Sequence, residues 1–300
     1  LISAGQAVAL TDRVMEGVNT LLAQDGPLGK PHYAEAWLGL ALRAFADAGC
    51  EVGIVEVGMG GRYDATNIVM PRVSVISTVH YDHTRVLGET LDAIAFHKAG
   101  IIKPGVPAVV GEVPQVAWEV IEQEASRRGA RLVRLGRDVR YEPLELTQHG
   151  GRFNYHGLHL HLDDARVGLL GAHQLANASV ALAAMEIYAD AEGLALDEAQ
   201  IREGLAAARF AGRLEVTQTD PLCVLDGAHN QEKISALLAA VPSIFHYERL
   251  ILVLGLLEAK TVDPILLALA ERADVVVTTS PSVKGKPALP AEDLAELAHR

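Results

Sequence analysis

Cysteine, positive charge and long apolar stretches are all scarce in this sequence. Its 300 residues include 2 cysteines, Cys50 and Cys223, which lie far apart and have no CxxC or Cys/His spacing. Such a chain offers neither a disulfide framework nor a cysteine-based zinc site, so a cytoplasmic location is the simplest inference. The 26 Lys and Arg are outnumbered by 38 Asp and Glu, and the resulting net charge of −12 argues against non-specific nucleic-acid binding.

Two further features are missing from the sequence. The best apolar run, Leu250–Leu257, falls well short of the roughly 18 residues that cross a bilayer, so we predict neither a membrane span nor a signal peptide. No G-x-x-x-x-G-K-[ST] phosphate-binding loop is present, because Gly29-Lys30 and Gly285-Lys286 are each followed by proline. The chain begins at Leu1 rather than Met and ends at His299-Arg300 within a helical pattern, which suggests a fragment.

The sequence does contain enough apolar material for a large core. Half of its residues are hydrophobic and the mean hydropathy is +0.19. Apolar runs typical of strands alternate with helical patterns, which predicts an α/β fold with a mostly parallel sheet. The expected helices and strands are 34–49, Val52–Val57, Val73–Thr78, Leu91–Ala99 closed by Gly100, Val106–Val110 and Val116–Arg128.

The pattern changes from residue 132 onward. Residues 132–169 alternate apolar and polar side chains around the His149-Gly150-Gly151 turn, which predicts a small antiparallel patch, and residues 174–207 return to helix. After a linker at 209–212 we expect a second, Rossmann-like α/β unit with strands in PLCVLDGAHN, LILVLGLL and ADVVVTTSP and a helix at Glu232–Ala240. The sequence therefore predicts two domains, 1–209 and 210–300.

Polar residues stand where two of the apolar strands end, which is how open α/β sheets build a ligand site. Glu56 ends the first strand and is either a metal ligand or a carboxylate held by backbone N–H groups. His83 follows the second strand beside Asp82 and is either a metal ligand or a core histidine. The GMGG segment between them permits close ligand approach, although it could simply reverse the chain.

The other charged residues near these turns each allow two interpretations, one functional and one structural. Arg62 and Asp64 could take part in a ligand site or form a surface ion pair. Lys98 lies on the following helix, where local sequence alone favours an exposed lysine. In the second unit, Asp226 suits a ribose hydroxyl or a helix N-cap, and Arg213 could reach a phosphate or form a salt bridge that locks the linker.

Taken together, five segments resemble the folylpolyglutamate synthase/dihydrofolate synthase family of Mur-type ATP-dependent ligases. They occur in the order found in that family and cover most of the chain. The segments are EVGMGGRYDATN (56–67), DHTRVLGETLDAIAFHKAGIIKPGVP (82–107), GAHQLANASVAL (171–182), AGRLEV (211–216) and LDGAHN (225–230).

The resemblance implies that ATP phosphorylates a substrate carboxylate and that the amine of L-glutamate then attacks the acyl phosphate, with release of ADP and phosphate. The implied substrates are ATP, L-glutamate and a folate or dihydropteroate, and the implied cofactor is Mg²⁺. The implied metal ligands are Glu56, His83 and a carbamylated Lys98. The implied nucleotide contacts are Asn177, Arg213, Asp226 and His229. The implied catalytic residues are Lys98, His83, Asp226 and His229. The implied substrate contacts are Arg62, Asp64 and Ala65.

Three departures from the family pattern stand out. The P-loop is missing and is expected upstream of Leu1. The family's Thr-x-Phe-Glu segment is replaced by His32-Tyr33-Ala34-Glu35, so the stacking phenylalanine has become Ala34. Losing an aromatic platform could remove about 0.5–1.5 kcal/mol of stacking, unless Tyr33 or Trp37 substitutes. His97 replaces the usual glutamate before Lys98, and Glu258-Ala259-Lys260 only partly matches an acidic-Lys-acidic segment.

These observations leave three hypotheses for function. The leading one is an ATP-dependent ligase that adds glutamate to a folate or dihydropteroate, acting as a monomer without nucleic-acid or membrane partners. The second is a Mur-type ligase for another carboxylate substrate, for which Ala34 is the main argument. The third is a non-catalytic nucleotide-binding paralogue, which the missing P-loop leaves open.

Overall fold

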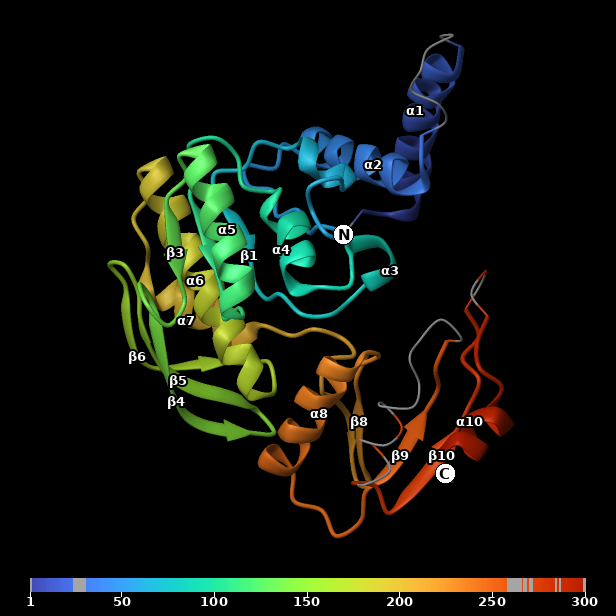
Figure 1. Cartoon of the computed structure of the whole chain (residues 1–300). Coiled ribbons are helices and arrows are strands. Elements are labelled where there is room, and N and C mark those ends of the chain that lie inside the picture. Colours follow the sequence, from blue (N-terminus) through green and yellow to red (C-terminus); the bar gives the residue numbers. More distant parts are fainter. Residues whose placement is uncertain are drawn as a thin grey trace. The chain divides into compact units, whose positions relative to one another are not determined.

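The computed structural model describes residues 2–23, 31–257, 266, 269, 272–283, 285 and 287–298 (Figure 1). The predicted Glu258-Ala259-Lys260 segment lies outside these residues. The chain forms two compact units, each assembled from separate stretches. The first unit comprises 1–71, 83–106 and 114–130, and the second comprises 72–82, 107–113 and 131–300. No helix in the described stretches combines the length and apolar character needed to span a membrane.

The first unit is built from helices. They are α1 (Ala4–Ala23), α2 (Tyr33–Asp47), the 3₁₀ helix η1 (Ala65–Ile68), α3 (Thr84–Leu87), α4 (Leu91–Ala99) and α5 (Gln115–Arg128). Helix α2, predicted over 34–49, begins at a capping box in which His32 accepts from the Ala34 N–H and Glu35 accepts from the His32 N–H. Helix α4 has the predicted bounds and packs against α5.

Gly100 ends α4 as predicted, but for a different reason than a left-handed cap. Its φ of −62° is ordinary right-handed helix, so any residue could adopt this backbone conformation. The constraint is space, because a Cβ on Gly100 would overlap Cβ and Cα of Arg62. Glycine therefore allows the loop that contains Arg62 to lie directly against the end of α4.

The predicted strand Val52–Val57 is not formed. The segment has no regular secondary structure and no strand ladder with any other described residue, and Val52 is 55% exposed and Ile54 91% exposed. A strand is defined by hydrogen bonds to a neighbouring strand, so an apolar run that pairs with no other strand is not a strand. The prediction of a strand at Val52–Val57 is therefore wrong.

The second unit contains the predicted parallel sheet. Strands β1 (Ser74–Ile76), β2 (Ala108–Val110) and β3 (Leu132–Arg134) lie in the order β1-β2-β3 with parallel pairing throughout. Helix α6 (Ala172–Glu192) packs against this sheet, and its buried face contacts the buried Val109 and Val133 in one cluster. Helix α7 (Glu198–Ala207) follows after Gly193 ends α6.

The predicted antiparallel patch is present, but it is shorter than the predicted range 132–169 because Leu132–Arg134 pairs in the parallel sheet. Strands β4 (Arg140–Thr147), β5 (Gly150–His156) and β6 (His161–Val167) lie side by side in that order (Figure 1). The inward side chains Phe153, Tyr155 and Leu162 are fully buried and belong to the same core cluster as Leu175 of α6. Helix α6 thus joins the parallel and antiparallel sheets into one hydrophobic core.

The remaining part of the second unit forms two small sheets. Strand β8 (Leu222–Leu225) pairs antiparallel with β7 (Glu215–Thr219), while β9 (Ile251–Leu254) pairs parallel with β10 (Val275–Thr278). The helices of this part are α8 (Gln231–Ile244) and α10 (Ala291–Ala298). The prediction of an α/β fold with a parallel sheet and a small antiparallel sheet is confirmed, although β7 was not foreseen.

Candidate active site

The first unit contains a pocket of about 570 Å³ beside the glycine turn. Its aromatic lining comes from α2, with Tyr33 and Trp37 in edge-to-face contact at 5.9 Å between ring centroids. Its polar lining includes Glu56 and Asp64. Ala34, which stands where the resemblance predicts an aromatic platform, also lines this pocket. Aromatic walls with a few polar groups suit a flat ligand that has a polar edge.

Asp64 holds the glycine turn in shape. Its carboxylate accepts hydrogen bonds from the Met59 N–H at 3.0 Å, the Thr66 N–H at 3.0 Å and the Thr66 hydroxyl at 2.5 Å. Partial burial acts to raise the pKa of Asp64, but these bonds, chiefly those from Thr66, hold the pKa below its usual value. The surface ion pair with Arg62 considered from the sequence is therefore wrong, because Asp64 caps η1 instead.

Replacing Asp64 with asparagine should lower the free energy of unfolding in a pH-dependent way. The folded-state pKa lies below the ordinary 3.8, so the stabilisation is complete above that pH and is lost as the pH falls through the folded-state pKa. Urea unfolding of wild type and Asp64→Asn, compared from neutral pH to about pH 3, should show a difference that shrinks below pH 3.8. A difference that is constant across this range would contradict the assignment.

Arg62 is engaged by the protein on several sides. Its Nη2 forms an ion pair with Oε2 of Glu124 at 3.2 Å, and its guanidinium stacks 3.9 Å from the ring centre of Phe96. Glu124 is buried and also accepts from Nε of Arg128 at 3.1 Å. Burial acts to raise the pKa of Glu124, but Arg62 and Arg128 keep it below its usual value. A direct contact of Arg62 with substrate stays a prediction.

The loop after the glycine turn caps the end of the helix that carries Lys98. The Arg62 N–H donates to the His97 carbonyl at 2.7 Å, and Nε of Arg62 donates to the Phe96 carbonyl at 3.2 Å. Nδ2 of Asn67 donates to the Gly100 carbonyl at 3.2 Å. These bonds satisfy carbonyls that a helix end leaves without an intrahelical partner. Lys98, itself half-buried, therefore sits on backbone that the loop fixes on both sides.

The other two predicted metal ligands are exposed. Glu56 lies within the segment Val52–Val57, and it lines the pocket. His83 directly precedes α3 and has the left-handed conformation, with φ 51° and ψ 34°. A non-glycine residue in this region is uncommon and is often found at functional sites. The core-histidine alternative for His83 is wrong.

In the second unit, Asp226 organises the DGAHN turn. Its Oδ2 accepts from the Leu214 N–H at 2.8 Å and its Oδ1 from the Ala228 N–H at 2.7 Å. The N-cap of α8 is Asn230, which accepts from the Lys233 N–H at 2.9 Å. The N-cap alternative for Asp226 is therefore wrong, and Asp226 instead ties the turn to the backbone beside Arg213.

The two strand-end motifs meet through Asp82. Nδ2 of Asn230 donates to Asp82 at 3.1 Å, and Nζ of Lys233 lies 4.0 Å from the same carboxylate. The imidazole of His229 donates from Nδ1 to the Gly227 carbonyl at 2.8 Å, while its Nε2 lies 3.4 Å from the Lys233 ammonium. A carbonyl only accepts and an ammonium only donates, so His229 carries its proton on Nδ1.

His173 lies near the predicted nucleotide contacts of the second unit. Desolvation lowers the pKa of its imidazole; the charge of Asp226 opposes this shift and that of Arg213 adds to it. Asn177 is exposed one turn further along α6. The structure therefore brings His173, Arg213 and Asp226 within electrostatic reach of one another. Arg213 also lies over Gly227, where a Cβ would come within 2.8 Å of its guanidinium.

Sequence reasoning did not single out His173, Gln174, Glu124 or Lys233. A signal for His173 was available, since Gly-Ala-His occurs both at 171–173 and at 227–229. No local pattern distinguishes Glu124 from the other charged residues of α5, because its partner Arg62 is distant in sequence. Within the described residues, no three His, Cys, Asp or Glu side chains gather closely enough to hold a metal by themselves.

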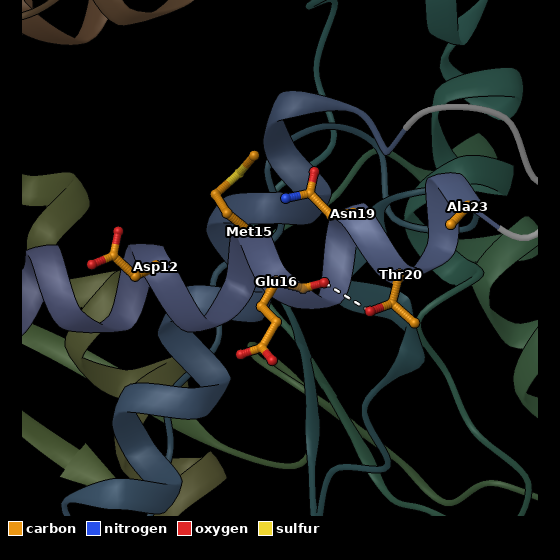
Figure 2. A pocket seen from close by; sticks show the side chains of 6 residues that line it. All are labelled: Asp12, Met15, Glu16, Asn19, Thr20 and Ala23. Atoms are coloured by element: carbon orange, nitrogen blue, oxygen red, sulfur yellow. Dashed lines mark hydrogen bonds between the residues drawn. The ribbon is translucent and has the colours of Figure 1, made fainter.

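A second hollow runs along α1 and shows none of these features. Figure 2 shows its lining side chains on one helix, with the Thr20 hydroxyl donating to the Glu16 carbonyl at 2.9 Å. The lining residues are Asp12, Met15, Glu16, Asn19, Thr20 and Ala23. We assign no function to it, because its described walls come from a single helix.

Comparison with known proteins identifies the relatives of the chain. Residues 32–185 match the Mur ligase middle domain, and residues 212–300 match the glutamate ligase domain of Mur ligases. The chain is 38% identical over 195 residues to the folylpolyglutamate synthase of Lacticaseibacillus casei, covering 65% of this chain. It is 37% identical over 309 residues to the dihydrofolate synthase/folylpolyglutamate synthase of Mycobacterium tuberculosis, covering 98% of this chain.

Solved structures agree with these matches. The Mycobacterium tuberculosis folylpolyglutamate synthase complexed with ADP superposes with a TM-score of 0.91 at 35% identity, covering 99% of this chain and 66% of that one. A folylpolyglutamate synthase structure in complex with AMPPCP and folate gives a TM-score of 0.86 at 32% identity, covering 97% of this chain and 70% of that one. The chain spans 46% of the length of the Lacticaseibacillus relative and 62% of the Mycobacterium relative. The chain belongs to the Mur ligase family, in the group that contains the folylpolyglutamate and dihydrofolate synthases.

Proposed function

We propose that this chain forms part of an ATP-dependent ligase that joins L-glutamate to a folate-type carboxylate. The substrate is tetrahydrofolate, for polyglutamylation, or dihydropteroate, for conversion to dihydrofolate, or both. The observation that carries the proposal is the pocket of about 570 Å³, which combines the aromatic residues of α2 with Glu56 and Asp64 of the glycine turn. Its size and lining suit a flat heterocycle such as a pterin.

The proposed reaction proceeds in two steps. The carboxylate oxygen of the substrate attacks the terminal phosphorus of ATP, and ADP leaves with the electron pair of the broken P–O bond. The amine of L-glutamate then attacks the acyl carbon, an amide forms, and phosphate and a proton are released. Because charge builds up on phosphate oxygens, positioned positive charge in the site lowers the barrier.

The first unit is proposed to hold Mg²⁺ through Glu56, His83 and Lys98. Magnesium prefers oxygen donors and usually keeps several waters, so it needs only one or two carboxylates besides substrate phosphates. Glu56 offers one carboxylate, and carbamylation of Lys98 would offer a second anionic oxygen donor. When bound, the ion would neutralise phosphate charge and orient the transferred group.

The second unit is proposed to hold the nucleotide. Asn177 would contact adenine, Asp226 the ribose and Arg213 a phosphate, with His229 beside them. The support is that Asp226 fixes the backbone at Leu214, next to Arg213, so both residues are positioned by one set of hydrogen bonds. Asp82, adjacent to His83 in sequence, is tied to the same turn through Asn230.

For the folate substrate, we propose that Tyr33 and Trp37 replace the aromatic platform that Ala34 lacks. Tyr33 is 72% exposed and Trp37 53% exposed, so both rings are open to a ligand. The loop residues Arg62, Asp64 and Ala65 would complete this end of the site. We further propose domains at 1–209 and 210–300, a monomer, and a cytoplasmic location, which suits the free cysteines Cys50 and Cys223.

The proposed function is tested by phosphate release from ATP in the natural protein that contains this chain. Dihydropteroate and tetrahydrofolate are offered separately, with Mg²⁺ and with or without L-glutamate. Glutamate-dependent release with either substrate supports the ligase and identifies the activity. If no phosphate is released with either substrate but ATP still binds, another carboxylate substrate is favoured. If the protein turns over none of a panel of carboxylates, a non-catalytic paralogue is favoured.

Replacing His83 with alanine should raise the Mg²⁺ concentration needed for half-maximal activity. Loss of a residue that only supports a metal ligand typically weakens metal binding by about 10- to 100-fold, so loss of the ligand itself should cost at least as much. The measurement is phosphate release across a magnesium titration. Arg85→Ala, an exposed charge on the same short helix, is the matched control and should leave the titration unchanged. An unchanged magnesium dependence in His83→Ala would remove His83 from the metal site.

A further inference from the structure

Three polar side chains form a hydrogen-bonded chain on the first two turns of α6. Nδ2 of Asn177 donates to Oε1 of Gln174 at 3.1 Å. The other end of the Gln174 amide, Nε2, lies 3.2 Å from Nε2 of His173. Gln174 is 7% exposed, so its amide is held inside the protein, whereas His173 and Asn177 are exposed.

The orientation of the Gln174 amide, with Nε2 toward His173 and Oε1 toward Asn177, sets the direction of both bonds in this chain. An amide nitrogen only donates, so Nε2 of His173 must accept and the imidazole carries its proton on Nδ1. A neutral imidazole agrees with the lowered pKa of His173. Desolvation is the main cause of the lowering, the charge of Asp226 acts to raise the pKa, and the charge of Arg213 lowers it further. With Nε2 of Gln174 committed to His173, only Oε1 of Gln174 can face Asn177. Asn177 must therefore turn its Nδ2 toward Gln174.

The backbone before the helix is shaped to permit this arrangement. Gly171, the residue before α6, has φ 102°, a value that side-chain-bearing residues rarely adopt. A Cβ on Gly171 would lie 2.6 Å from Cε1 and 2.9 Å from Nδ1 of the His173 ring. Glycine at this position thus leaves room for the imidazole to lie back over the start of the helix, where it meets Gln174.

We propose that Gln174 and His173 are positioning residues that select adenine over guanine by fixing the side-chain amide of Asn177. This inference rests on the proposed function, in which Asn177 contacts the nucleotide base. With Nδ2 turned toward Gln174, the corner of the amide presented away from Gln174 is Oδ1, an acceptor. The 6-amino group of adenine donates to an acceptor, whereas the 6-oxo group of guanine presents a second acceptor and is repelled.

The proposal is tested by measuring the affinities of the natural protein for Mg-ATP and Mg-GTP. Gln174→Leu removes both hydrogen bonds and places an apolar side chain of similar size in the buried position. The freed Asn177 amide can then rotate and offer Nδ2 to guanine. The ratio of GTP to ATP dissociation constants should fall by about tenfold, the equivalent of one hydrogen bond.

Two further variants keep the test decisive. His173→Leu acts on the same chain from an exposed position and should lower the ratio in the same direction, by about threefold, even if Gln174→Leu folds poorly. Ser179→Ala removes a buried hydroxyl from the same helix, which donates to the Leu175 carbonyl at 2.8 Å. It is the matched control, since it should lower stability and leave the ratio unchanged.

The outcomes separate the inference from the proposed function. A lower ratio in Gln174→Leu or His173→Leu, with an unchanged ratio in Ser179→Ala, supports the positioning role. ATP binding with the same ratio in wild type and both variants overturns the inference and leaves the ligase proposal standing. Failure of the wild type to bind either nucleotide overturns the proposed function and the inference together.

Discussion

Replacing Lys98 with alanine is expected to abolish ligase turnover while the protein remains folded. If Lys98 supplies an anionic oxygen to Mg²⁺ as a carbamate, its loss removes a group that acts on the transferred phosphate. The expected fall in kcat is about a thousandfold or more, as for loss of a principal electrostatic contact. Folding should survive because alanine is a strong helix former and the loop from Arg62 to Asn67 still caps α4.

The carbamate makes a sharper prediction than the loss of activity alone. Lys98→Arg keeps the positive charge but cannot form the same carbamate, so it should be as inactive as Lys98→Ala. A small carboxylic acid added to Lys98→Ala should restore part of the activity, since it can place an anionic oxygen in the vacated space. Phosphate release and thermal unfolding are measured for each variant. Wild-type turnover in Lys98→Ala would remove Lys98 from the site.

The second large effect is expected on stability, from replacing Glu186 with alanine. Glu186 is 1% exposed on α6, and its Oε1 accepts from the His159 and Leu160 N–H groups, each at 2.7 Å. Its Oε2 accepts from the Tyr155 hydroxyl at 2.7 Å. A Cβ on Gly157 would overlap this carboxylate, so the β5–β6 turn is closed tightly around it.

Glu186→Ala leaves the buried Tyr155 hydroxyl and two part-buried backbone N–H groups without an acceptor, and it creates a cavity. The free energy of unfolding should fall by about 3–5 kcal/mol, since each orphaned donor costs about 1–3 kcal/mol before the site relaxes. Glu186→Gln is the matched control. Its Oε1 can accept from both backbone N–H groups, and its Nε2 can donate to the tyrosine oxygen, so most of the stability should be retained.

Urea unfolding of wild type and both variants measures these differences. Equal losses in Glu186→Ala and Glu186→Gln would mean that the charge, rather than the hydrogen bonds, is what matters at this site. A loss below about 1 kcal/mol in Glu186→Ala would show that the turn does not depend on this anchor. Because α6 also carries His173 and Asn177, loosening this helix should weaken nucleotide binding as well.

The helices and strands that were predicted correctly are those whose sequence pattern lies within the helix or strand itself. The bounds of α4 follow from its apolar pattern and from Gly100, and the β4–β5 hairpin follows from alternation around Gly150. The segment Val52–Val57 has an equally strong apolar pattern but no ladder among the described residues, because pairing depends on a second strand that local sequence does not specify.

The candidate site was foreseen as a set of residues but not as a set of contacts. The motifs identified Asp64 and Asp226, yet both carboxylates proved to bind backbone N–H groups of nearby turns. The partners of Arg62 could not be inferred, because Glu124 joins it from a distant helix. The hydrogen bonds of His173 and Gln174 depend on how the helix start is folded, which only the three-dimensional arrangement reveals.

The central claim is that the substrate carboxylate is activated by phosphorylation before glutamate attacks it. The most direct measurement uses a folate substrate whose reacting carboxylate is labelled with heavy oxygen, incubated with ATP, Mg²⁺ and L-glutamate in the natural protein. Mass spectrometry should find one labelled oxygen in each phosphate released and a glutamyl amide in the product. Phosphate without label would show that the lost carboxylate oxygen leaves by another route, and it would contradict the acyl phosphate and with it the proposed ligase mechanism.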